Sequence, residues 1–245
     1  MTQYEAIVNR RAKGKKAFAL LVDPDKLLLE KVPGLVKDAE EAGVDYFFVG
    51  GSLMTHDHFE SCVSALRASS AVPVLLFPGN GLQISHKAHG ILFLSLISGR
   101  NPEMLIGHHV VSAPYLRRSP LEVISTGYML IESGTPTAVS YMSNTTPIPH
   151  EKNDIAMCTA MAGEMLGMKA IFLDAGSGAK TPVSVSMIDA VRSSIQVPLI
   201  VGGGIRSGAM ARQACKAGAD IIVVGNACEA EPKLMYEISE SVHSS

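Results

Sequence analysis

Short apolar segments recur along this chain, and helix-like segments separate most of them. Each segment is apolar with few interruptions, which is typical of parallel strands that are covered on both faces. The predicted strands are Phe18–Asp23, Tyr46–Gly50, Val74–Pro78, Ile91–Leu96, Gly127–Ile131, Ala170–Asp174, Leu199–Gly202 and Ile221–Gly225. Eight strands that alternate with helices predict an α/β protein, and they favour a closed (β/α)8 TIM barrel over an open sheet.

Four of the connections carry clear helical signals. Asp154–Leu166 and Ser184–Ser194 have apolar residues at helical spacing. Leu35–Ala42 and Ala209–Ala217 each stop directly before a glycine, which is a common helix end. The 245 residues are close to the roughly 250 that one such barrel needs. We therefore expect a single TIM-barrel domain over residues 1–245.

Two connections depart from this pattern. Gly79–Gly90 has early glycines and no apolar stripe, so we expect an irregular or missing third helix, with a short irregular helix as the alternative. A missing helix would leave an apolar groove in the barrel wall. Glu132–Lys152 is rich in Ser, Thr and Pro, and connections of that length are usually functional or disordered.

The bulk properties exclude several classes of protein. The chain has 21 basic and 23 acidic residues and no basic block, which argues against a nucleic-acid partner. No apolar signal segment begins the chain, and no run approaches the roughly 20 residues that span a bilayer. The cysteines lack C-x-x-C spacing. We expect a soluble, cytoplasmic protein, with peripheral membrane contact left open.

Glycines at the ends of the last three strands predict a phosphate site. The seventh strand runs into Gly202-Gly203-Gly204, the eighth into Gly225-Asn226, and the sixth into Asp174-Ala175-Gly176-Ser177-Gly178. Glycines let the backbone approach a ligand closely, and successive unpaired N–H groups attract anions. Because the carboxyl ends of barrel strands share one face, these three loops are expected to bind one phosphate together.

Polar side chains at the strand ends are candidates for chemistry. Asp174 would lie beside a bound phosphorylated substrate, where a general base is needed, although an aspartate that caps the turn is the alternative. Asp23-Pro24-Asp25-Lys26 ends the first strand, and its charges suit a hard cation with a phosphate or a solvated turn. Ser52 follows the second strand as a metal or phosphate ligand or a helix cap. Tyr128 either bonds a substrate oxygen or packs in the core.

The histidines occur in close pairs, His56 with His58 and His108 with His109. Neither pair has the i, i+4 spacing that places two metal ligands on one helix face. We therefore expect solvated surface positions for both pairs.

Taken together, these motifs resemble the geranylgeranylglyceryl phosphate synthase family, which includes bacterial heptaprenylglyceryl phosphate synthases. The resembling segments are Leu21–Lys26, Val49–Ser52, Phe77–Asn80, Leu173–Gly178, Val201–Arg206 and Val224–Asn226. They extend over almost the whole chain. The glycine motifs alone would fit many phosphate-binding barrels, but the combination is specific.

The resemblance implies a magnesium-dependent prenyltransferase. Such an enzyme moves a polyprenyl group, here expected to be geranylgeranyl, from its diphosphate to the C3 hydroxyl of sn-glycerol 1-phosphate, which gives an ether-lipid precursor. Asp23 and Ser52 correspond to the Mg2+ ligands, with Asp25 as a further candidate. The expected substrate-binding residues are Phe172, Leu173, Asp174, Ala175, Gly176, Ser177, Gly178, Gly203, Gly204, Gly225 and Asn226, with Lys26 and Tyr128. The family also implies a groove for the prenyl tail after the third strand, and a dimer or hexamer.

One departure from the family concerns the sixth strand. Many members have Tyr-Leu-Glu where this chain has Phe172-Leu173-Asp174. Aspartate keeps the carboxylate on a shorter side chain, so either the substrate sits slightly deeper or Asp174 only orients the hydroxyl. Whether Asp174 takes the hydroxyl proton stays open. Tyr128 could replace the hydroxyl that Phe172 lacks. Two other readings stay open: a sugar-phosphate isomerase or lyase, and a phosphate-binding barrel without activity.

Overall fold

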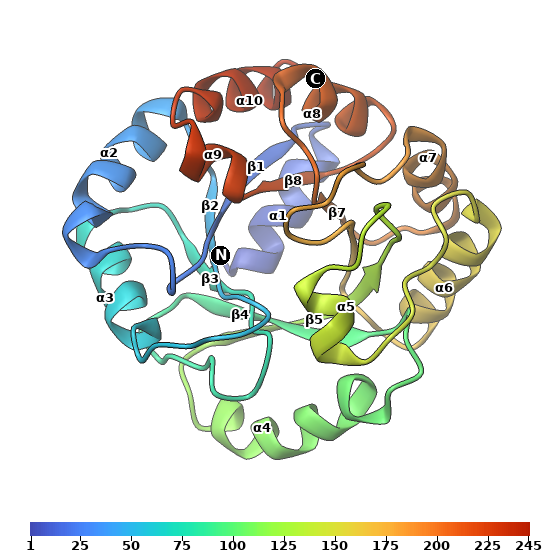
Figure 1. Cartoon of the computed structure of the whole chain (residues 1–245), viewed down its shortest axis with the longest axis horizontal. Coiled ribbons are helices and arrows are strands. Elements are labelled where there is room, and N and C mark those ends of the chain that lie inside the picture. Colours follow the sequence, from blue (N-terminus) through green and yellow to red (C-terminus); the bar gives the residue numbers. More distant parts are fainter.

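The computed structural model describes residues 1–245, apart from the side chains of residues 229 and 230, and it contains a closed barrel of parallel strands (Figure 1). The strands are β1 (Ala17–Val22), β2 (Tyr46–Val49), β3 (Val74–Leu76), β4 (Gly90–Leu96), β5 (Glu122–Leu130), β6 (Ala170–Asp174), β7 (Leu199–Gly202) and β8 (Ile221–Val224). Each strand pairs with the next, and β8 pairs with β1. The predicted TIM barrel is confirmed.

Helices surround the strands in a ring (Figure 1). They are α2 (Val32–Ala42), α3 (Phe59–Ser69), α4 (His108–Arg117), α6 (Asn153–Met165), α7 (Val185–Ser194), α8 (Gly208–Lys216) and α10 (Leu234–His243). Shorter helical turns are η1 (Leu29–Lys31), the π-helical η2 (Glu103–Gly107), α5 (Ala138–Ser143) and α9 (Asn226–Ala230). Among the described residues, we find no helix with both the length and the apolar character to cross a membrane.

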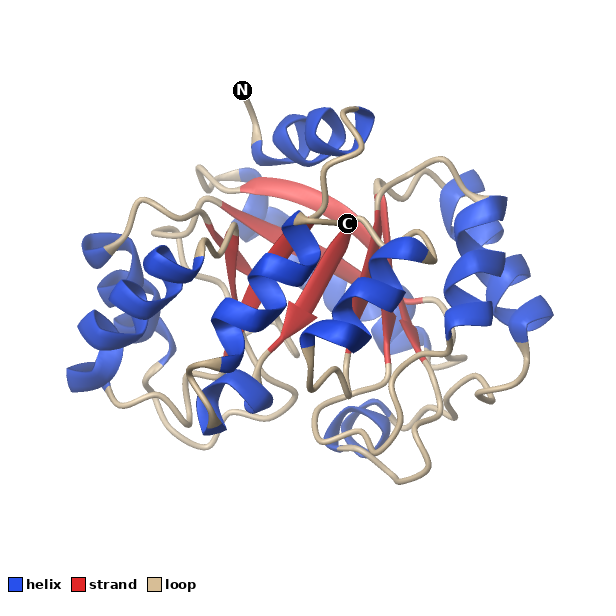
Figure 2. Ribbon diagram, turned by 90° about the horizontal axis from the view of Figure 1, so that it is seen from above, coloured by secondary structure: helices blue, strands red, loops and turns tan.

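The remaining helix, α1 (Gln3–Ala12), covers the amino-terminal end of the barrel (Figure 2). Its Ile7 packs with the residues inside the barrel. Glu122, the first residue of β5, accepts a hydrogen bond from the N–H of Tyr4 at 3.0 Å, which ties the start of α1 to the strands. The helix α1 therefore closes the amino-terminal end of the barrel, and the loops at the carboxyl-terminal end stay open.

The barrel interior is filled with large side chains. Phe48, Leu75 and Leu92 are completely buried inside the barrel, and alternate residues of the same strands pack against the helices. Burying each such side chain stabilises the fold by about 1.5–3 kcal/mol. Phe77 and Phe172 lie at the top of this core, with ring centroids 5.2 Å apart. In a barrel with a packed interior, a ligand binds at the mouth formed by the carboxyl ends of the strands.

The wall of the barrel has the predicted gap between β3 and β4. Residues 79–89, all of which the structure describes, form turns and bends without a helix. The expectation of a missing third helix is therefore confirmed. The long connection after β5 folds into α5, which begins with Thr137 as its capping residue and lies over the barrel mouth (Figure 1). The strand β5 starts earlier than predicted, because Ser125 and Thr126 interrupt its apolar pattern.

Candidate active site

The loops after β6 and β7 present unpaired backbone donors. Gly176, Gly178, Gly203 and Gly204 have φ values of +88°, +76°, +81° and +73°, in the left-handed region that favours glycine. Within the described chain, no group accepts from the N–H of Ser177, Gly178, Gly203 or Gly204. Such clusters of N–H groups bind anions.

The third predicted loop, after β8, joins the other two through a side chain. The amide of Asn226 donates to Ser177 Oγ at 2.8 Å. At the start of α8, the N–H of Gly208 already donates to Glu237 at 2.6 Å, so it is not available to a ligand. The structure thus brings the three strand ends together, and the loop N–H groups are the donors that a phosphate would meet.

The loops after β6 and β7 also fit closely against each other. A Cβ atom at Gly203 would lie 2.6 Å from the backbone nitrogen of Gly176 and 2.7 Å from that of Ala175. Arg206 donates to the carbonyl of Ala179 at 2.5 Å, which ties the same two loops together. No side chain larger than hydrogen fits at position 203 without moving the backbone of the neighbouring loop.

Gly203→Ala is expected to displace the phosphate-binding loops. The new methyl group would clash with two backbone nitrogens, so we expect a loss of about 1–3 kcal/mol in the free energy of unfolding and at least about tenfold weaker binding of inorganic phosphate. Calorimetry and thermal unfolding would measure both. Gly178→Ala is the matched control, because it has a similar positive φ and no atom within 4 Å of the added Cβ. Equal losses in the two variants would contradict the close fit.

Asp174 is held in a buried hydrogen-bonded pair with Tyr128. The Tyr128 hydroxyl donates to Asp174 Oδ2 at 2.6 Å, and the N–H of Gly176 donates to Oδ1 at 2.7 Å. Burial raises the pKa of Asp174, although both hydrogen bonds oppose the rise. Burial and the neighbouring carboxylate raise the pKa of Tyr128 well above its usual value. Asp174 is therefore a carboxylate with increased basicity, and Tyr128 remains protonated and holds it in place.

The other predicted residues on β6, and Ala175 directly after it, lie below this pair or face outward. The ring of Phe172 is buried between Phe77 and Tyr128, inside the barrel. The side chains of Leu173 and Ala175 are buried in the layer between strands and helices. Their packing positions Asp174 and Gly176 at the end of the strand, and their own side chains do not reach the loops at the mouth.

The ends of β1 and β2 meet on the other side of the mouth. The carboxyl group of Asp23 lies against Gly51, since a Cβ there would be 3.4 Å from Asp23 Oδ1, and Ser52 is the next residue. Asp25 is occupied differently: its carboxylate accepts from the Thr55 hydroxyl at 2.8 Å and from the N–H groups of Thr55 and His56. These bonds lower the pKa of Asp25, with the Thr55 N–H as the largest cause. Asp25 thus holds the loop after β1 to the loop after β2. Asp23 is the other carboxylate of this motif and the one that could bind a cation.

The residues around Asp23 would suit Mg2+, which needs few protein ligands, better than a metal ion that is bound by protein side chains alone. No group of three or more His, Cys, Asp or Glu side chains that could hold a metal occurs among the described residues. Mg2+ binds through one or two carboxylates and completes its shell with water and substrate phosphate. Asp23 and the Ser52 hydroxyl are the residues that would hold such an ion.

Lys26 connects the two sides of the mouth. Its Nζ lies 3.0 Å from Asp23 Oδ2 and donates to Asn226 Oδ1 at 3.1 Å. Through the bond between Asn226 and Ser177, a continuous line of polar contacts runs from the end of β1 to the end of β6.

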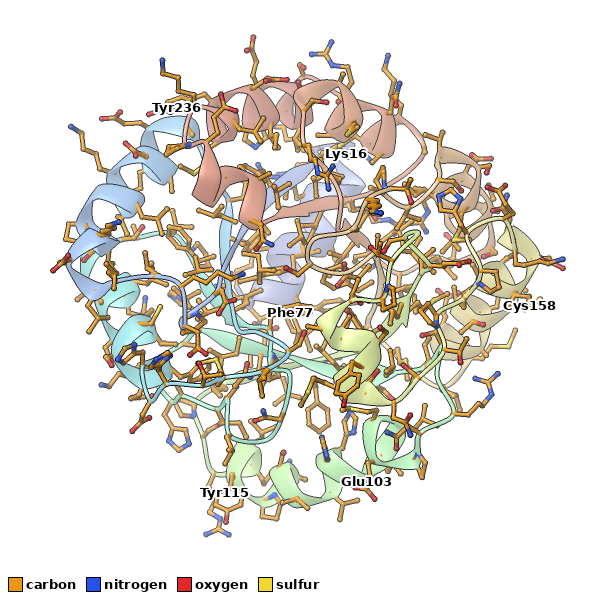
Figure 3. The ribbon with its side chains drawn as sticks, in the orientation of Figure 1. Lys16, Phe77, Glu103, Tyr115, Cys158 and Tyr236 are labelled. Atoms are coloured by element: carbon orange, nitrogen blue, oxygen red, sulfur yellow. The ribbon has the colours of Figure 1, made fainter. Side chains whose placement is uncertain are left out.

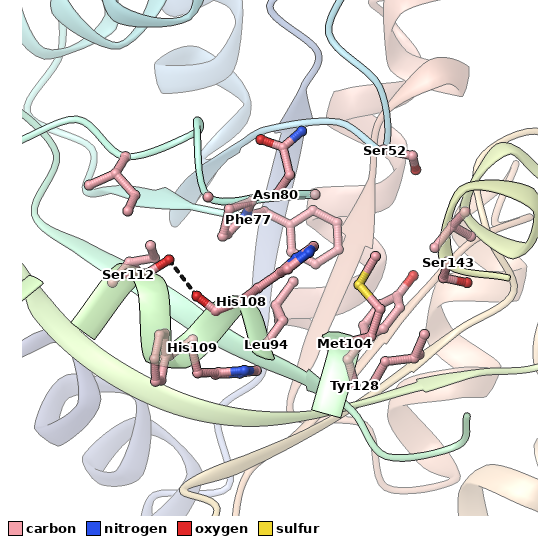
Figure 4. Close-up of a pocket in the computed structure, with 18 of the residues that line it drawn as sticks. Ser52, Phe77, Asn80, Leu94, Met104, His108, His109, Ser112, Tyr128 and Ser143 are labelled. Atoms are coloured by element: carbon pink, nitrogen blue, oxygen red, sulfur yellow. Dashed lines mark hydrogen bonds between the residues drawn. The ribbon is translucent and has the colours of Figure 1, made fainter. Parts of the chain in front are cut away.

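An apolar cavity of about 110 Å³ opens beside this mouth, where the third helix is missing (Figure 4). It lies between the loop after β3, the outer face of β4, and the helical segment η2–α4. Its lining includes Phe77, Pro78, Ile84, Ile91, Phe93, Leu94, Leu96, Met104, Leu116, Val139 and Met142. Gly51, Ser52 and Tyr128 line its inner end, so the cavity reaches both the cation side and the Asp174 side of the mouth. Figure 3 shows that Phe77, which lines the cavity, lies near the barrel centre, whereas Tyr115 lies on the outside of α4.

Sequence reasoning missed the residue that shapes this gap. Gln83 is buried, its Oε1 accepts from the N–H groups of Gly51 and Gly79 at 3.2 Å each, and its Nε2 donates to the Gly51 carbonyl at 2.7 Å. It thereby holds the loops after β2 and β3 together. The available signal in the sequence was Gln83 itself, a single amide side chain within Gly79–Gly90, which has no helical pattern.

The prediction for the histidines is only partly correct. His56 and His58 are exposed as expected, with stacked rings 5.4 Å apart. His108 and His109 are half-buried and line the apolar cavity, so their assignment to the solvated surface is wrong. The ring of His109 packs edge-on to Phe93 at 4.4 Å. The expectation considered only the spacing of metal ligands, whereas the fold packs both residues against the cavity beside the missing third helix.

Eight parallel strands with an anion-binding set of loops and a buried carboxylate at one mouth define a phosphate-binding TIM barrel. Comparison with known proteins narrows this class, because residues 9–242 match the model of the PcrB family. The chain belongs to the PcrB family. It is 56% identical over 241 residues to the geranylgeranylglyceryl phosphate synthase of Chitinophaga pinensis, covering 98% of this chain and 96% of the relative. It is 42% identical to that of Thermococcus gammatolerans, over 92% of this chain and 89% of the relative.

A solved structure shows the same arrangement. It is (S)-3-O-geranylgeranylglyceryl phosphate synthase from Thermoplasma acidophilum in complex with sn-glycerol-1-phosphate. The TM-score is 0.95 at 30% sequence identity, and the match covers 100% of both chains.

Proposed function

We propose that this protein is a geranylgeranylglyceryl phosphate synthase. It transfers a geranylgeranyl group from its diphosphate to the C3 hydroxyl of sn-glycerol 1-phosphate and forms an ether-lipid precursor. One observation carries the proposal: the phosphate-binding loops after β6, β7 and β8 share a mouth with an apolar cavity that begins at Ser52 and Tyr128. A polar headgroup and a hydrocarbon tail can therefore meet at Asp174. The relatives named for this activity support the same conclusion.

Each half of the site has a role in this reaction. The N–H groups of Ser177, Gly178, Gly203 and Gly204 bind the phosphate of glycerol 1-phosphate, and Asn226 closes the site. The prenyl tail lies in the cavity beside α4, which removes apolar surface from water.

The cation side of the mouth serves the leaving group. Asp23 and Ser52 would hold Mg2+, which neutralises the diphosphate and makes it a better leaving group. The allylic C–O bond breaks, and the diphosphate leaves with the electron pair. The glycerol C3 oxygen forms the new C–O bond, and its proton passes to Asp174. Tyr128 holds this carboxylate toward the hydroxyl through the 2.6 Å bond.

Tyr128→Phe is expected to change the pH dependence of the reaction. The Tyr128 hydroxyl lowers the pKa of Asp174, so its removal should raise that pKa further. The base must be deprotonated to act, so the acidic limb of the kcat/KM profile should move to higher pH. Steady-state rates across the acid range measure this shift. Tyr236→Phe, at a half-exposed position on α10, is the control. An unmoved limb, or one moved to lower pH, would contradict the role of Asp174 as base.

A sugar-phosphate isomerase or lyase is the second candidate. The phosphate-binding loops would serve such an enzyme equally well. It would have no use for an apolar cavity that runs from Ser52 to Leu116, so the cavity favours prenyl transfer.

The direct test uses labelled sn-glycerol 1-phosphate with a series of prenyl diphosphates and Mg2+. The proposal predicts lipid-soluble label, with the highest rate for the geranylgeranyl donor and little transfer to sn-glycerol 3-phosphate. Binding of glycerol phosphate without label transfer, over all chain lengths, would instead indicate a barrel without this activity.

We also propose that the protein forms a homo-oligomer, a dimer or a hexamer. Ile106, Val110, Val111 and Tyr115 on the outside of η2–α4 and Tyr141 on α5 are all more than half exposed. Exposed large apolar side chains along η2–α4 are typical of contact surfaces. Light scattering coupled to size-exclusion chromatography would measure the mass, and a monomer at micromolar concentration would contradict this proposal. Peripheral contact with a membrane is a further expectation, and vesicle flotation measures it.

A further inference from the structure

Lys26 stands out because its ammonium group contacts both halves of the site. It lies 3.0 Å from Asp23 Oδ2 on the cation side and 3.1 Å from Asn226 Oδ1 on the phosphate side. Half of the side chain is exposed, at 50%, so its tip can move. The Lys26 N–H donates to the Asp23 carbonyl at 3.1 Å, which fixes the backbone while the side chain moves.

The ammonium lies at the oxygen that a divalent cation would use. Asp23 Oδ1 already accepts from the N–H of Asp25 at 3.1 Å, and the Asp25 carboxylate is bound to Thr55 and His56. Among the described residues, Lys26 is the one partner of Asp23 Oδ2, so an ion that binds through this oxygen has to displace the ammonium. An ammonium and a divalent cation repel each other at this range.

We propose that Lys26 is an internal cation that competes with a bare divalent ion for Asp23 and, once displaced, binds the diphosphate that arrives with the ion. The Lys26 side chain would thus weaken the binding of the metal ion alone and strengthen the binding of the metal ion together with its diphosphate. Because the same ammonium releases Asn226 when it moves, it also couples the cation side to the glycerol phosphate side. The identity of the diphosphate as a prenyl donor rests on the proposed function, whereas the competition for Asp23 does not.

The test measures two affinities of the full-length protein without any prenyl substrate. Lys26→Met should bind Mn2+ alone about three- to tenfold more tightly, because a competing ion pair and a nearby positive charge are removed. The same variant should bind Mn2+ with inorganic pyrophosphate more weakly, by a similar factor. Electron paramagnetic resonance of free Mn2+ gives both values. Lys26→Arg keeps the charge and should stay near wild type, and Lys26→Gln should behave like Lys26→Met.

Two further variants assign the effect to this site. Lys31→Met removes an exposed charge on the same connection between β1 and α2, and it should change neither affinity by more than about twofold. Asp23→Asn combined with Lys26→Met should lose the gain in Mn2+ affinity. Affinities in Lys26→Met that both stay unchanged, or both move in the same direction, would overturn the proposal.

The outcome is separable from the fate of the proposed function. If labelled glycerol phosphate gives lipid-soluble product but Lys26→Met shows no opposite changes, the inference about Lys26 fails alone. If the opposite changes occur but no prenyl transfer is detected, the competition at Asp23 stands and the proposed function fails.

Discussion

Asp174→Asn is expected to lower kcat by about 10²–10⁴-fold while glycerol phosphate still binds. The amide oxygen of asparagine can accept the hydrogen bond that Tyr128 or Gly176 now donates to the carboxylate, so the shape of the site should persist. The amide cannot take a proton from the glycerol hydroxyl. The loss should therefore fall on the chemical step and leave KM for glycerol phosphate within about threefold.

Single-turnover rates and calorimetric binding would separate the two effects. Asp189→Asn on the exposed face of α7 removes the same charge away from the mouth and serves as the control. If Asp174→Asn kept kcat within a few-fold of wild type, Asp174 would only orient the hydroxyl. A large loss confined to binding would show that it only shapes the phosphate loop.

Asp23→Asn has the second large expected effect. The change removes the carboxylate charge that lies against Gly51 and keeps the side-chain shape. Without it, neutralisation of the leaving diphosphate should be impaired, and turnover at limiting Mg2+ should fall by about 10²-fold or more. A higher Mg2+ concentration should restore part of the rate.

Initial rates over a range of Mg2+ concentrations measure this effect. Asp57→Asn, on the exposed loop after β2, is a matched control that should keep the wild-type metal requirement. An Asp23→Asn enzyme with full turnover and an unchanged metal requirement would move the cation site elsewhere.

The parts of the fold with uninterrupted apolar sequence were the most predictable. Ala170–Asp174 and Leu199–Gly202 are strands with the predicted bounds, because strands covered on both faces must be apolar throughout. The gap after β3 was also predictable, since Gly79–Gly90 offers no apolar stripe for a helix to bury. The start of β5 was missed at Ser125 and Thr126, where polar residues continue a strand.

The chemistry of the site depends on contacts that sequence spacing does not reveal. Tyr128 and Asp174 are 46 residues apart, Gly51 and Gln83 are 32 apart, and Lys26 and Asn226 are 200 apart. The glycine loops were predictable because each is a local motif with a fixed place at a strand end. The pairing of particular side chains across the barrel mouth requires the closed fold.

The most direct test is a crystal structure with sn-glycerol 1-phosphate and a non-reactive analogue of geranylgeranyl diphosphate. We expect the phosphate of glycerol 1-phosphate within hydrogen-bonding distance of the N–H groups of Ser177 and Gly203, with the C3 hydroxyl directed at Asp174. We expect the prenyl tail between Phe93 and Met104. A phosphate bound away from these loops, or a tail outside the cavity, would contradict it.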